Sequence, residues 1–299
     1  MPMRTSVVVR LAGGLGNQMF HYAAGRAVAL ATGRRLLLDE AGILRGPSGR
    51  RYELPVFRIA GVPAGLLDRT LVRAQVGGRV PPALRDIVRA TSRRRWTLLG
   101  DREAGFDERL FTTAGDLVLD GFWQSAGYPD RTPEIAGQLR HDFALRQPLP
   151  DRLAAVAAEV AACESVGVHV RRGDYAHDPT IAAVHGTLPL DYYAAAAAWL
   201  AARRDAPSFF VFSDDPAWAR AHLRLPGPTR VVDEAAGLSP AVDQRLLASC
   251  RHFIVANSTF SWWAAWLGAS PDKLVVAPRQ WFADRPTPAG LLPASWTVL

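Results

Sequence analysis

Apolar runs of strand length alternate with segments of helical periodicity along much of the chain. Residues 5–11 form a β-branched run that ends in a glycine-rich turn. Residues 18–32 then place apolar positions at helical spacing and end at Gly33, a residue typical of helix C-termini. A second apolar run follows at 34–40. Strand, turn, helix and strand in this order predict a β-α-β unit and a parallel sheet.

The second half of the chain repeats this alternation. Strands are predicted at residues 165–170, 208–213, 229–233, 252–256 and 273–277. Helices are predicted at residues 151–163, 190–203, 216–222, 240–249 and from about 259. This pattern is typical of a doubly wound α/β domain. Prolines near residues 145–151 interrupt it, so we predict two α/β domains, residues 1–148 and 149–299.

The weakest pattern lies at residues 43–115. Prolines, glycines and arginines are mixed there with short helical patches such as 81–92. We predict helices and loops inserted in the first domain. Residues 117–125 predict a further strand that reaches the functional edge of the sheet.

Composition narrows the class of protein. The chain has 299 residues, of which 49% are hydrophobic, but no run approaches the roughly 18 apolar residues of a membrane span. Its N-terminal apolar stretch enters a glycine turn and predicts a first strand rather than a signal peptide. Cys163 and Cys250 give no disulfide framework, and no histidines stand at metal-ligand spacing. We therefore expect a cytoplasmic protein with no metal site and no transmembrane segment.

The net charge is +7, and all basic residues are arginine except Lys273. A basic surface favours anionic partners such as nucleotide phosphates, nucleic acid or acidic lipid. Basic residues are not interleaved with aromatic ones in a stripe, so no nucleic-acid partner is predicted. Peripheral association with a membrane surface is compatible with this charge.

The glycine turn at residues 13–18 carries the first candidate chemistry. Gly14 and Gly16 let backbone amides and the following helix N-terminus approach an anion, and Asn17 adds a side-chain amide. Asp39 at the end of the next strand suggests a dinucleotide site, hence an NAD(P)-linked oxidoreductase. However, Met19 occupies the place of the third glycine that this fingerprint needs. A purely structural turn is the other alternative.

A basic cluster follows the predicted strand at 165–170. His169 and Arg171 lie on one face of the strand by alternation. The planar forks of Arg171 and Arg172 suit a phosphate and neutralise charge on a departing diphosphate. Asp174 either orients an arginine or contacts substrate. A surface ion pair is the structural alternative for any single one of them.

Two further loops follow predicted strands. Asp215 belongs to an aspartate pair and either accepts hydrogen bonds from a guanine or caps the helix that begins at Pro216. Hydroxyls and amides at a helix start suit a phosphate, although ordinary capping also explains them. The residues concerned are Ser258, Thr259, Phe260 and Ser261. The tryptophans at 262, 263 and 266 stand at helical spacing and are predicted to pack in the core.

These segments together resemble a known family. They are GGLGNQMFHYAAGRA (13–27), DGFWQS (120–125), HVRRGDY (169–175), FSDDPAW (212–218) and ANSTFSWWAAWL (256–267). In this order they are similar to the bacterial galactoside α-1,2-fucosyltransferases of glycosyltransferase family 11. Weaker similarities occur at YELPVF, HGTLPLDYY and PRQWF, so the resemblance spans residues 8–282.

The resemblance implies a GT-B-like fold, with two doubly wound α/β domains facing a cleft. Domain 149–299 would bind GDP-fucose and domain 1–148 a galactose-terminated oligosaccharide acceptor. The implied chemistry is an inverting transfer of fucose to the 2-hydroxyl of a β-galactoside, without metal or other cofactor. Transfer to another hydroxyl or to protein, and a non-catalytic sugar- or nucleotide-binding protein, remain alternatives.

The resemblance also implies roles for individual residues. Arg171 corresponds to the essential arginine on the β-phosphate, and Asn17 to an asparagine near that phosphate and the transferred sugar. His169 and Asp215 correspond to guanosine contacts, and residues 258–260 to the phosphate-side loop.

The sequence departs from the family pattern at two places near the expected acceptor cleft. His21 stands where glutamine is usual, and Ala126-Gly127 replaces a commonly charged pair. Both departures concern the acceptor rather than the donor. A general base for the acceptor hydroxyl is expected, with Asp39, Glu40, His21 and Asp174 as candidates.

Overall fold

The computed structural model describes the chain except at a few short segments. The described residues are 4–45, 50–76, 81–83, 86–87, 92, 94–101, 105–234, 237 and 239–299. The helical patch predicted at 81–92 therefore lies largely outside them. The chain divides into two compact units, Met1–Ala144 with Ala289–Leu291, and Leu145–Pro288 with Leu292–Leu299.

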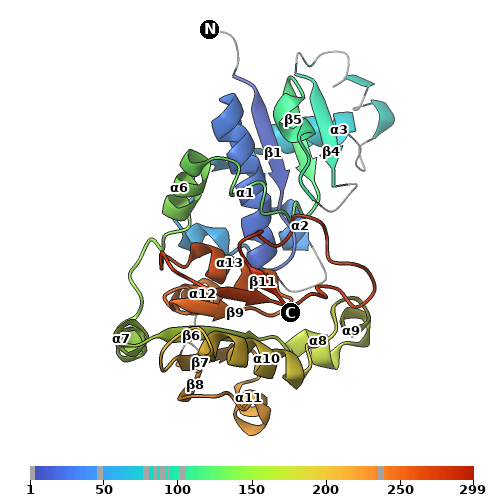
Figure 1. The fold of residues 1–299 in the computed structure, drawn as a ribbon. Helices are drawn as coiled ribbons and strands as arrows, with labels where there is room; N and C mark the ends of the chain where they lie inside the picture. The colour runs from blue at the N-terminus through green and yellow to red at the C-terminus, as the bar shows by residue number, and fades with distance from the viewer. Residues whose placement is uncertain are drawn as a thin grey trace. The chain divides into compact units, whose positions relative to one another are not determined.

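The first unit is a parallel α/β layer structure (Figure 1). Its strands are β1 (Ser6–Arg10), β2 (Arg35–Asp39), β3 (Val62–Pro63), β4 (Trp96–Gly100) and β5 (Asp116–Asp120). Its helices are α1 (Leu15–Thr32), α2 (Ala41–Arg45), η1 (Leu54–Val56), α3 (Leu66–Val76), α5 (Arg109–Thr112) and α6 (Pro133–Asp142). The strand order is β3-β2-β1-β5-β4, and every pairing is parallel.

Two expectations for this unit are corrected. The region 43–115 was expected to hold only helices and loops, but it contributes β3 and β4 to the edges of the sheet. The strand expected at 117–125 ends at Asp120, the last residue that pairs with β4, and the segment that follows includes Trp123 with φ +53°.

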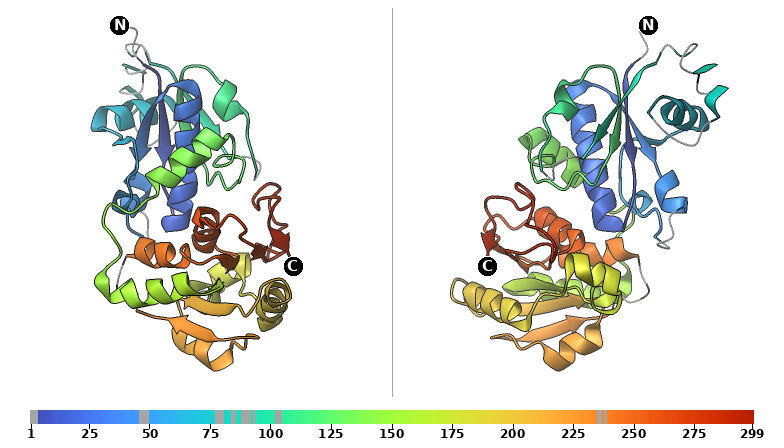
Figure 2. Two further views of the ribbon diagram at one scale, coloured as in Figure 1. Left: turned by 60° about the vertical axis from the view of Figure 1, so that its left-hand side comes forward. Right: turned by 90° about the vertical axis from the view of Figure 1, so that its right-hand side faces the viewer.

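Helices cover both faces of the first sheet (Figure 2). Val72 of α3 packs with Val8 in a buried cluster on one face. On the other face α1 approaches very closely at Gly25, where an added Cβ would overlap the Cγ2 methyl of Val9. Because neighbouring strand residues point to opposite faces, Val8 and Val9 serve the two layers separately. Close helix–sheet packing therefore depends on Gly25, while Met19, at the place of the missing third glycine, is itself fully buried.

The second unit repeats the architecture with a larger sheet. Its strands are β6 (Ser165–Val170), β7 (Ser208–Ser213), β8 (Thr229–Val232), β9 (His252–Ile254), β10 (Val275–Ala277) and β11 (Thr297–Val298). Its helices are η2 (Asp151–Leu153), α7 (Ala154–Ala162), α8 (Gly173–His177), α9 (Pro179–His185), α10 (Leu190–Ala201), α11 (Pro216–His222), α12 (Pro240–Leu247) and α13 (Thr259–Leu267). The strand order is β11-β10-β9-β6-β7-β8, again with parallel pairings throughout.

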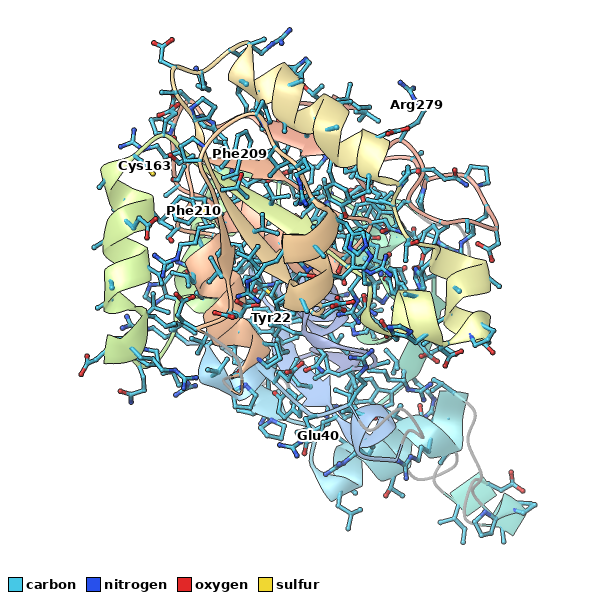
Figure 3. The ribbon with its side chains drawn as sticks, turned by 90° about the horizontal axis from the view of Figure 1, so that it is seen from below. Tyr22, Glu40, Cys163, Phe209, Phe210 and Arg279 are labelled. Atoms are coloured by element: carbon cyan, nitrogen blue, oxygen red, sulfur yellow. The ribbon has the colours of Figure 1, made fainter. Side chains whose placement is uncertain are left out.

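Here every predicted strand and helix is present in the predicted order, and β6 and β7 have the predicted bounds. The segment between β6 and α10, for which no helix was predicted, holds α8 and α9. One strand was missed: the predicted order closed at β10, whereas β11 pairs beside it at the edge of the sheet. Both faces of the sheet are covered, since Phe209 and Phe210, neighbours on β7, are each buried (Figure 3). Figure 1 shows α10 and α11 on one face and α12 and α13 on the other.

Each sheet has one place where the strand order reverses. In the first sheet this switch point lies between β1 and β5, and in the second between β6 and β9. The loops after two neighbouring strands diverge at a switch point and leave a crevice at the carboxyl ends, where open α/β sheets bind ligands. The topology thus marks the segments after these four strands as candidate binding positions.

Candidate functional site

In the second unit the segments after β6, β7 and β9 hold the polar residues that the sequence singled out. Arg171 and Arg172 follow β6 directly, and Ser258 follows β9 on the other side of the switch point. Asp214 and Asp215 follow β7, which pairs with β6. Separate motifs therefore meet at one edge of one sheet.

Arg171 is held between two carboxylates. Its Nη2 donates to Oδ1 of Asp174 at 2.6 Å, and its Nη1 lies 2.9 Å from Oδ2 of Asp214. The guanidinium carbon also lies 5.3 Å from the ring centroid of Tyr175. The side chain keeps 24% of its surface exposed. Its direction is thus fixed by neighbours, while part of the guanidinium stays open to a ligand.

Arg172 is positioned by different contacts. Its backbone amide donates to Oδ1 of Asp214 at 2.8 Å, and its guanidinium carbon lies 3.8 Å above the ring of Trp218. Oδ2 of Asp215 lies 3.6 Å from its Nε. The carboxylate of Asp214 therefore contacts the side chain of Arg171 and the backbone amide of Arg172.

Asp215 caps α11. Its Oδ1 accepts a hydrogen bond from the backbone amide of Trp218 at 3.0 Å, and Pro216 occupies the first turn. The capping interpretation is confirmed. A contact between this carboxylate and guanine stays a prediction, because one capping bond leaves further acceptor positions on the carboxylate.

The loop after β9 begins α13. Ser258 Oγ accepts from the amide of Phe260 at 3.4 Å, and the Ser261 hydroxyl donates to the carbonyl of Ser258 at 3.2 Å. Thr259 and Phe260 are partly exposed beside them. The tryptophans at 262, 263 and 266 are buried, which confirms their predicted place in the core.

His169 is a buried residue with an unsatisfied atom. Its ring packs against Phe260 with centroids 5.1 Å apart, and its Nδ1 finds no hydrogen-bond partner within the part of the chain that the structure describes. Burial, with a smaller effect of the positive charge of Arg171, lowers the pKa of His169 to about 3, so the ring is neutral at pH 7. A buried polar atom of this kind is a candidate ligand contact.

The three remaining predicted site residues lie in the first unit. Gly13 has φ +71°, and Gly14 is the N-cap of α1 without a side-chain cap. The side-chain amide of Gln18 donates to the carbonyl of Gly13 at 2.9 Å and so holds the turn. Gly16 is buried in the first turn of α1. Asn17 Oδ1 accepts from Gln124 Nε2 at 3.0 Å, a bond that links the turn after β1 to the turn after β5.

Comparison with known proteins identifies the family. The model of Glycosyl transferase family 11 matches residues 138–289. An α-1,2-colitosyltransferase of Escherichia coli is 32% identical over 288 residues, covering 92% of this chain and 92% of that protein. The chain belongs to glycosyl transferase family 11.

Other similarities agree with this membership. Galactoside α-(1,2)-fucosyltransferase 1 of Saimiri sciureus is 28% identical over 89% of this chain and 66% of its own length. A solved structure of Arabidopsis thaliana FUT1 in complex with GDP matches 92% of this chain and 71% of that chain, with a TM-score of 0.51 at 14% identity. The prediction of a glycosyltransferase with two GT-B-like α/β domains is confirmed. The oxidoreductase hypothesis is left without support.

Neither a metal-ligand group nor a membrane-spanning helix is found in the described part of this family 11 glycosyltransferase. Among the described residues, no three or more His, Cys, Asp or Glu side chains are grouped so that they could hold a metal ion. Of the helices that the structure describes, none combines the length and apolar character needed to cross a bilayer.

Sequence reasoning missed some residues of the arginine cluster. Asp214 was noted only as one of an aspartate pair, yet it contacts both Arg171 and Arg172. Trp218 was not singled out, although its ring lies under Arg172. The sequence feature that could have identified both residues is their position in FSDDPAW, directly after a predicted strand. In the structure this strand is β7, which pairs with β6.

Proposed function

We propose that this enzyme transfers fucose from GDP-fucose to the 2-hydroxyl of a terminal β-galactoside, with inversion at the anomeric carbon. Family membership supports sugar transfer, and the α-1,2 linkage and galactoside acceptor follow the names of its relatives. The second unit binds the donor and the first unit binds the acceptor in this proposal.

A second donor has a specific observation in its favour. The relative at 32% identity is named a colitosyltransferase. Colitose differs from fucose only by lacking the 3-hydroxyl group. A direct comparison of GDP-fucose and GDP-colitose is therefore part of the test.

The observation that carries the proposal is Arg171, fixed by two carboxylates beside a switch point and still partly exposed. Breaking the bond between the sugar and GDP places negative charge on the β-phosphate. A preorganised guanidinium stabilises such charge where it develops, without reorganisation during the reaction. Arg171 has this role in the proposal, and Arg172 adds positive charge beside it.

The start of α13 complements the arginines. Its first amides lack intrahelical acceptors and point out of a helix N-terminus, where an anion is favoured. We assign residues 258–261 to the phosphate side of the donor, and His169 Nδ1 and Asp215 to its guanosine part. Asn17, Gly14 and Gly16 are assigned to the sugar side, with Asp174 keeping Arg171 in place.

The proposed reaction is a single displacement. The acceptor oxygen forms a bond to the anomeric carbon, the bond from that carbon to the β-phosphate oxygen breaks, and its electron pair leaves with GDP. The acceptor hydroxyl loses its proton to a general base. Asp174 is already engaged with Arg171, and Asp39, Glu40 and His21 remain the other candidates for that role.

The test is a product assay. The purified chain is incubated with lactose and either GDP-fucose or GDP-colitose, with and without EDTA, and the product linkage is read by NMR. We expect a 2′-linked product from at least one donor, undiminished by EDTA. A product linked at another hydroxyl would overturn the regiochemistry, and activity lost with EDTA would overturn metal independence. Absence of transfer to lactose and to other β-galactosides would overturn the acceptor class.

A further inference from the structure

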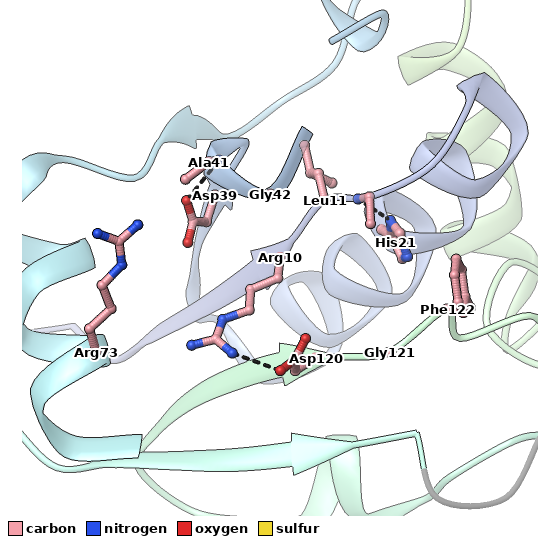
Figure 4. A pocket seen from close by; sticks show the side chains of 11 residues that line it. Arg10, Leu11, His21, Asp39, Ala41, Gly42, Arg73, Asp120, Gly121 and Phe122 are labelled. Atoms are coloured by element: carbon pink, nitrogen blue, oxygen red, sulfur yellow. Dashed lines mark hydrogen bonds and ion pairs between the residues drawn. The ribbon is translucent and has the colours of Figure 1, made fainter. Parts of the chain in front are cut away.

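The first unit contains a pocket of about 440 Å³ at the carboxyl ends of β1, β2 and β5 (Figure 4). A charged group lines one part of it and consists of Arg10, Asp39, Arg73 and Asp120. An aromatic pair lines another part and consists of His21 and Phe122. The pocket adjoins the switch point of this sheet and contains none of the residues assigned to the donor.

The charged group matches a neutral, hydroxyl-rich ligand. Its two guanidinium groups and two carboxylates sum to no net charge, so it does not select for phosphate. Arg10 Nη1 donates to Asp120 Oδ2 at 2.7 Å, while Asp39 is 8% exposed and accepts from the amide of Ala41 at 3.1 Å. Sugar hydroxyls both donate and accept, and this group offers both kinds of partner.

The aromatic pair supplies an apolar surface beside these charges. The His21 and Phe122 rings stack with centroids 5.7 Å apart and 26° between their planes. Ala12 donates its amide to His21 Nδ1 at 3.3 Å, which places the ring proton on Nε2. Burial lowers the pKa of His21 to about 3, so this side of the pocket is uncharged at pH 7.

The backbone around Phe122 holds its ring toward solvent. Asp101 accepts hydrogen bonds from the amides of Phe122 and Trp123, the latter at 3.0 Å. Trp123 is fully buried with φ +53°, a conformation that costs a bulky residue about 1–3 kcal/mol. Phe122 is left 49% exposed. A strained, clamped turn that displays a phenyl ring at a pocket is a feature of ligand sites.

We propose that this pocket binds a hexopyranose ring of the acceptor glycan. The C–H face of the sugar packs on Phe122, supported from behind by His21, and its hydroxyls bond to Asp39 and Arg10. Ligand pockets combine apolar walls with a few placed polar groups in this way. The inference rests on the proposed function, and it adds which residues of the first unit select the acceptor.

The kinetic test uses the full chain with lactose and the donor that supports turnover. Phe122→Ala is expected to raise the KM for lactose about tenfold and to leave the KM for the donor within twofold. Phe122→Tyr, which keeps the ring, should recover most of the lactose affinity that Phe122→Ala loses. Leu98→Ala, at a similarly exposed apolar residue of β4, is the matched control and should change neither constant. An unchanged KM for lactose, or an equal rise in both constants, would overturn the assignment.

Asp39 and His21 test the two sides of the pocket separately. Asp39→Asn still accepts the amide of Ala41 but loses its charge, so we expect a lower kcat/KM for lactose in a variant that folds normally. His21→Gln removes the stacked ring, and it is expected to change the relative kcat/KM values for lactose and other β-galactosides. Identical acceptor preference in His21→Gln and the parent would remove His21 from the proposal.

A binding experiment distinguishes this inference from the proposed function. Saturation-transfer NMR with methyl β-galactoside, and with methyl β-glucoside as a second hexose, needs no turnover. We expect a signal in the parent and in Arg171→Ala, and its loss in Phe122→Ala. If the parent transfers sugar but binding is independent of Phe122, only the inference fails. If it binds the hexoside through Phe122 without transferring sugar, only the proposed function fails. If it binds neither hexoside, the pocket assignment is overturned.

Discussion

Arg171 donates a hydrogen bond of 2.6 Å to Asp174, three residues later in the chain. Because Asp174 lies in the first turn of α8, the pair ties the arginine to the helix that follows β6. A guanidinium held in this way needs little further ordering when a diphosphate binds.

Replacement of Arg171 by alanine is expected to lower kcat/KM by about 10²–10³-fold, the usual effect of removing one donor that stabilises developing charge. Arg171→Lys should restore little, because an ammonium lacks the planar fork. Steady-state kinetics measure both effects. Arg203→Ala is the control, since this exposed arginine lies over Trp199 on another part of the unit. Activity of Arg171→Ala close to that of the parent would contradict the mechanism.

The buried Nδ1 of His169 is expected to accept a hydrogen bond from the donor nucleotide. His169→Phe keeps a ring beside Phe260 but removes that atom, so the Kd for GDP should rise about tenfold, which corresponds to about 1.4 kcal/mol. Calorimetry measures the affinity, with the exposed His141→Ala as control. Unchanged affinity together with a more stable fold would instead mean that the nitrogen is merely buried.

Asp215 has a capping contact in the structure and a proposed ligand contact, and two substitutions separate them. Asp215→Ala removes both and should cost about 1 kcal/mol of stability. Asp215→Ser keeps an oxygen for the amide of Trp218, so we expect a parental melting temperature but weaker GDP binding, measured on the same samples. If the serine variant binds GDP normally, the residue is a cap alone.

Stability should fall below neutral pH through His21. The folded-state pKa is about 3 and the ordinary value is 6.5, so between these pH values the unfolded chain binds a proton that the folded chain does not. The stability contribution of this group is present above pH 6.5 and decreases as the pH falls toward 3. From pH 7 to pH 5 the loss is about 2 kcal/mol. Chemical denaturation at pH 7 and at pH 5 should show a smaller loss of stability in His21→Gln than in the parent. His169 is present in both proteins, so its own contribution cancels in the comparison.

Two helix glycines form a matched pair for stability. Gly25→Ala introduces a Cβ that overlaps Val9 and should destabilise the first unit by about 1–3 kcal/mol. Gly137→Ala in α6 meets nothing within 4 Å and should stabilise that unit by about 0.5–1 kcal/mol. Opposite shifts in thermal unfolding are expected. Equal shifts would show that helix propensity, rather than the approach of α1 to the sheet, decides both.

The sequence predicted the second unit better than the first for a physical reason. A buried parallel strand such as β6 is a continuous apolar run between polar turns, so its bounds are local information. In contrast, β3 and β11 have two residues each and no periodicity of their own. β4 lies at the edge of its sheet with an irregular burial pattern, and so it also escaped prediction.

The sequence by itself determined the position of the buried strands, the glycine turn, and the motifs that carry Arg171 and Ser258, because these depend on neighbours along the chain. Only the tertiary structure decided that β5 lies beside β1, that Gln124 reaches Asn17, and that Asp214 lies against Arg171. It also assembled the pocket around Phe122 from separate segments. Strand order depends on which apolar faces pack best when the whole unit folds. This packing is decided by contacts between residues far apart in the sequence, so no single stretch of sequence determines it.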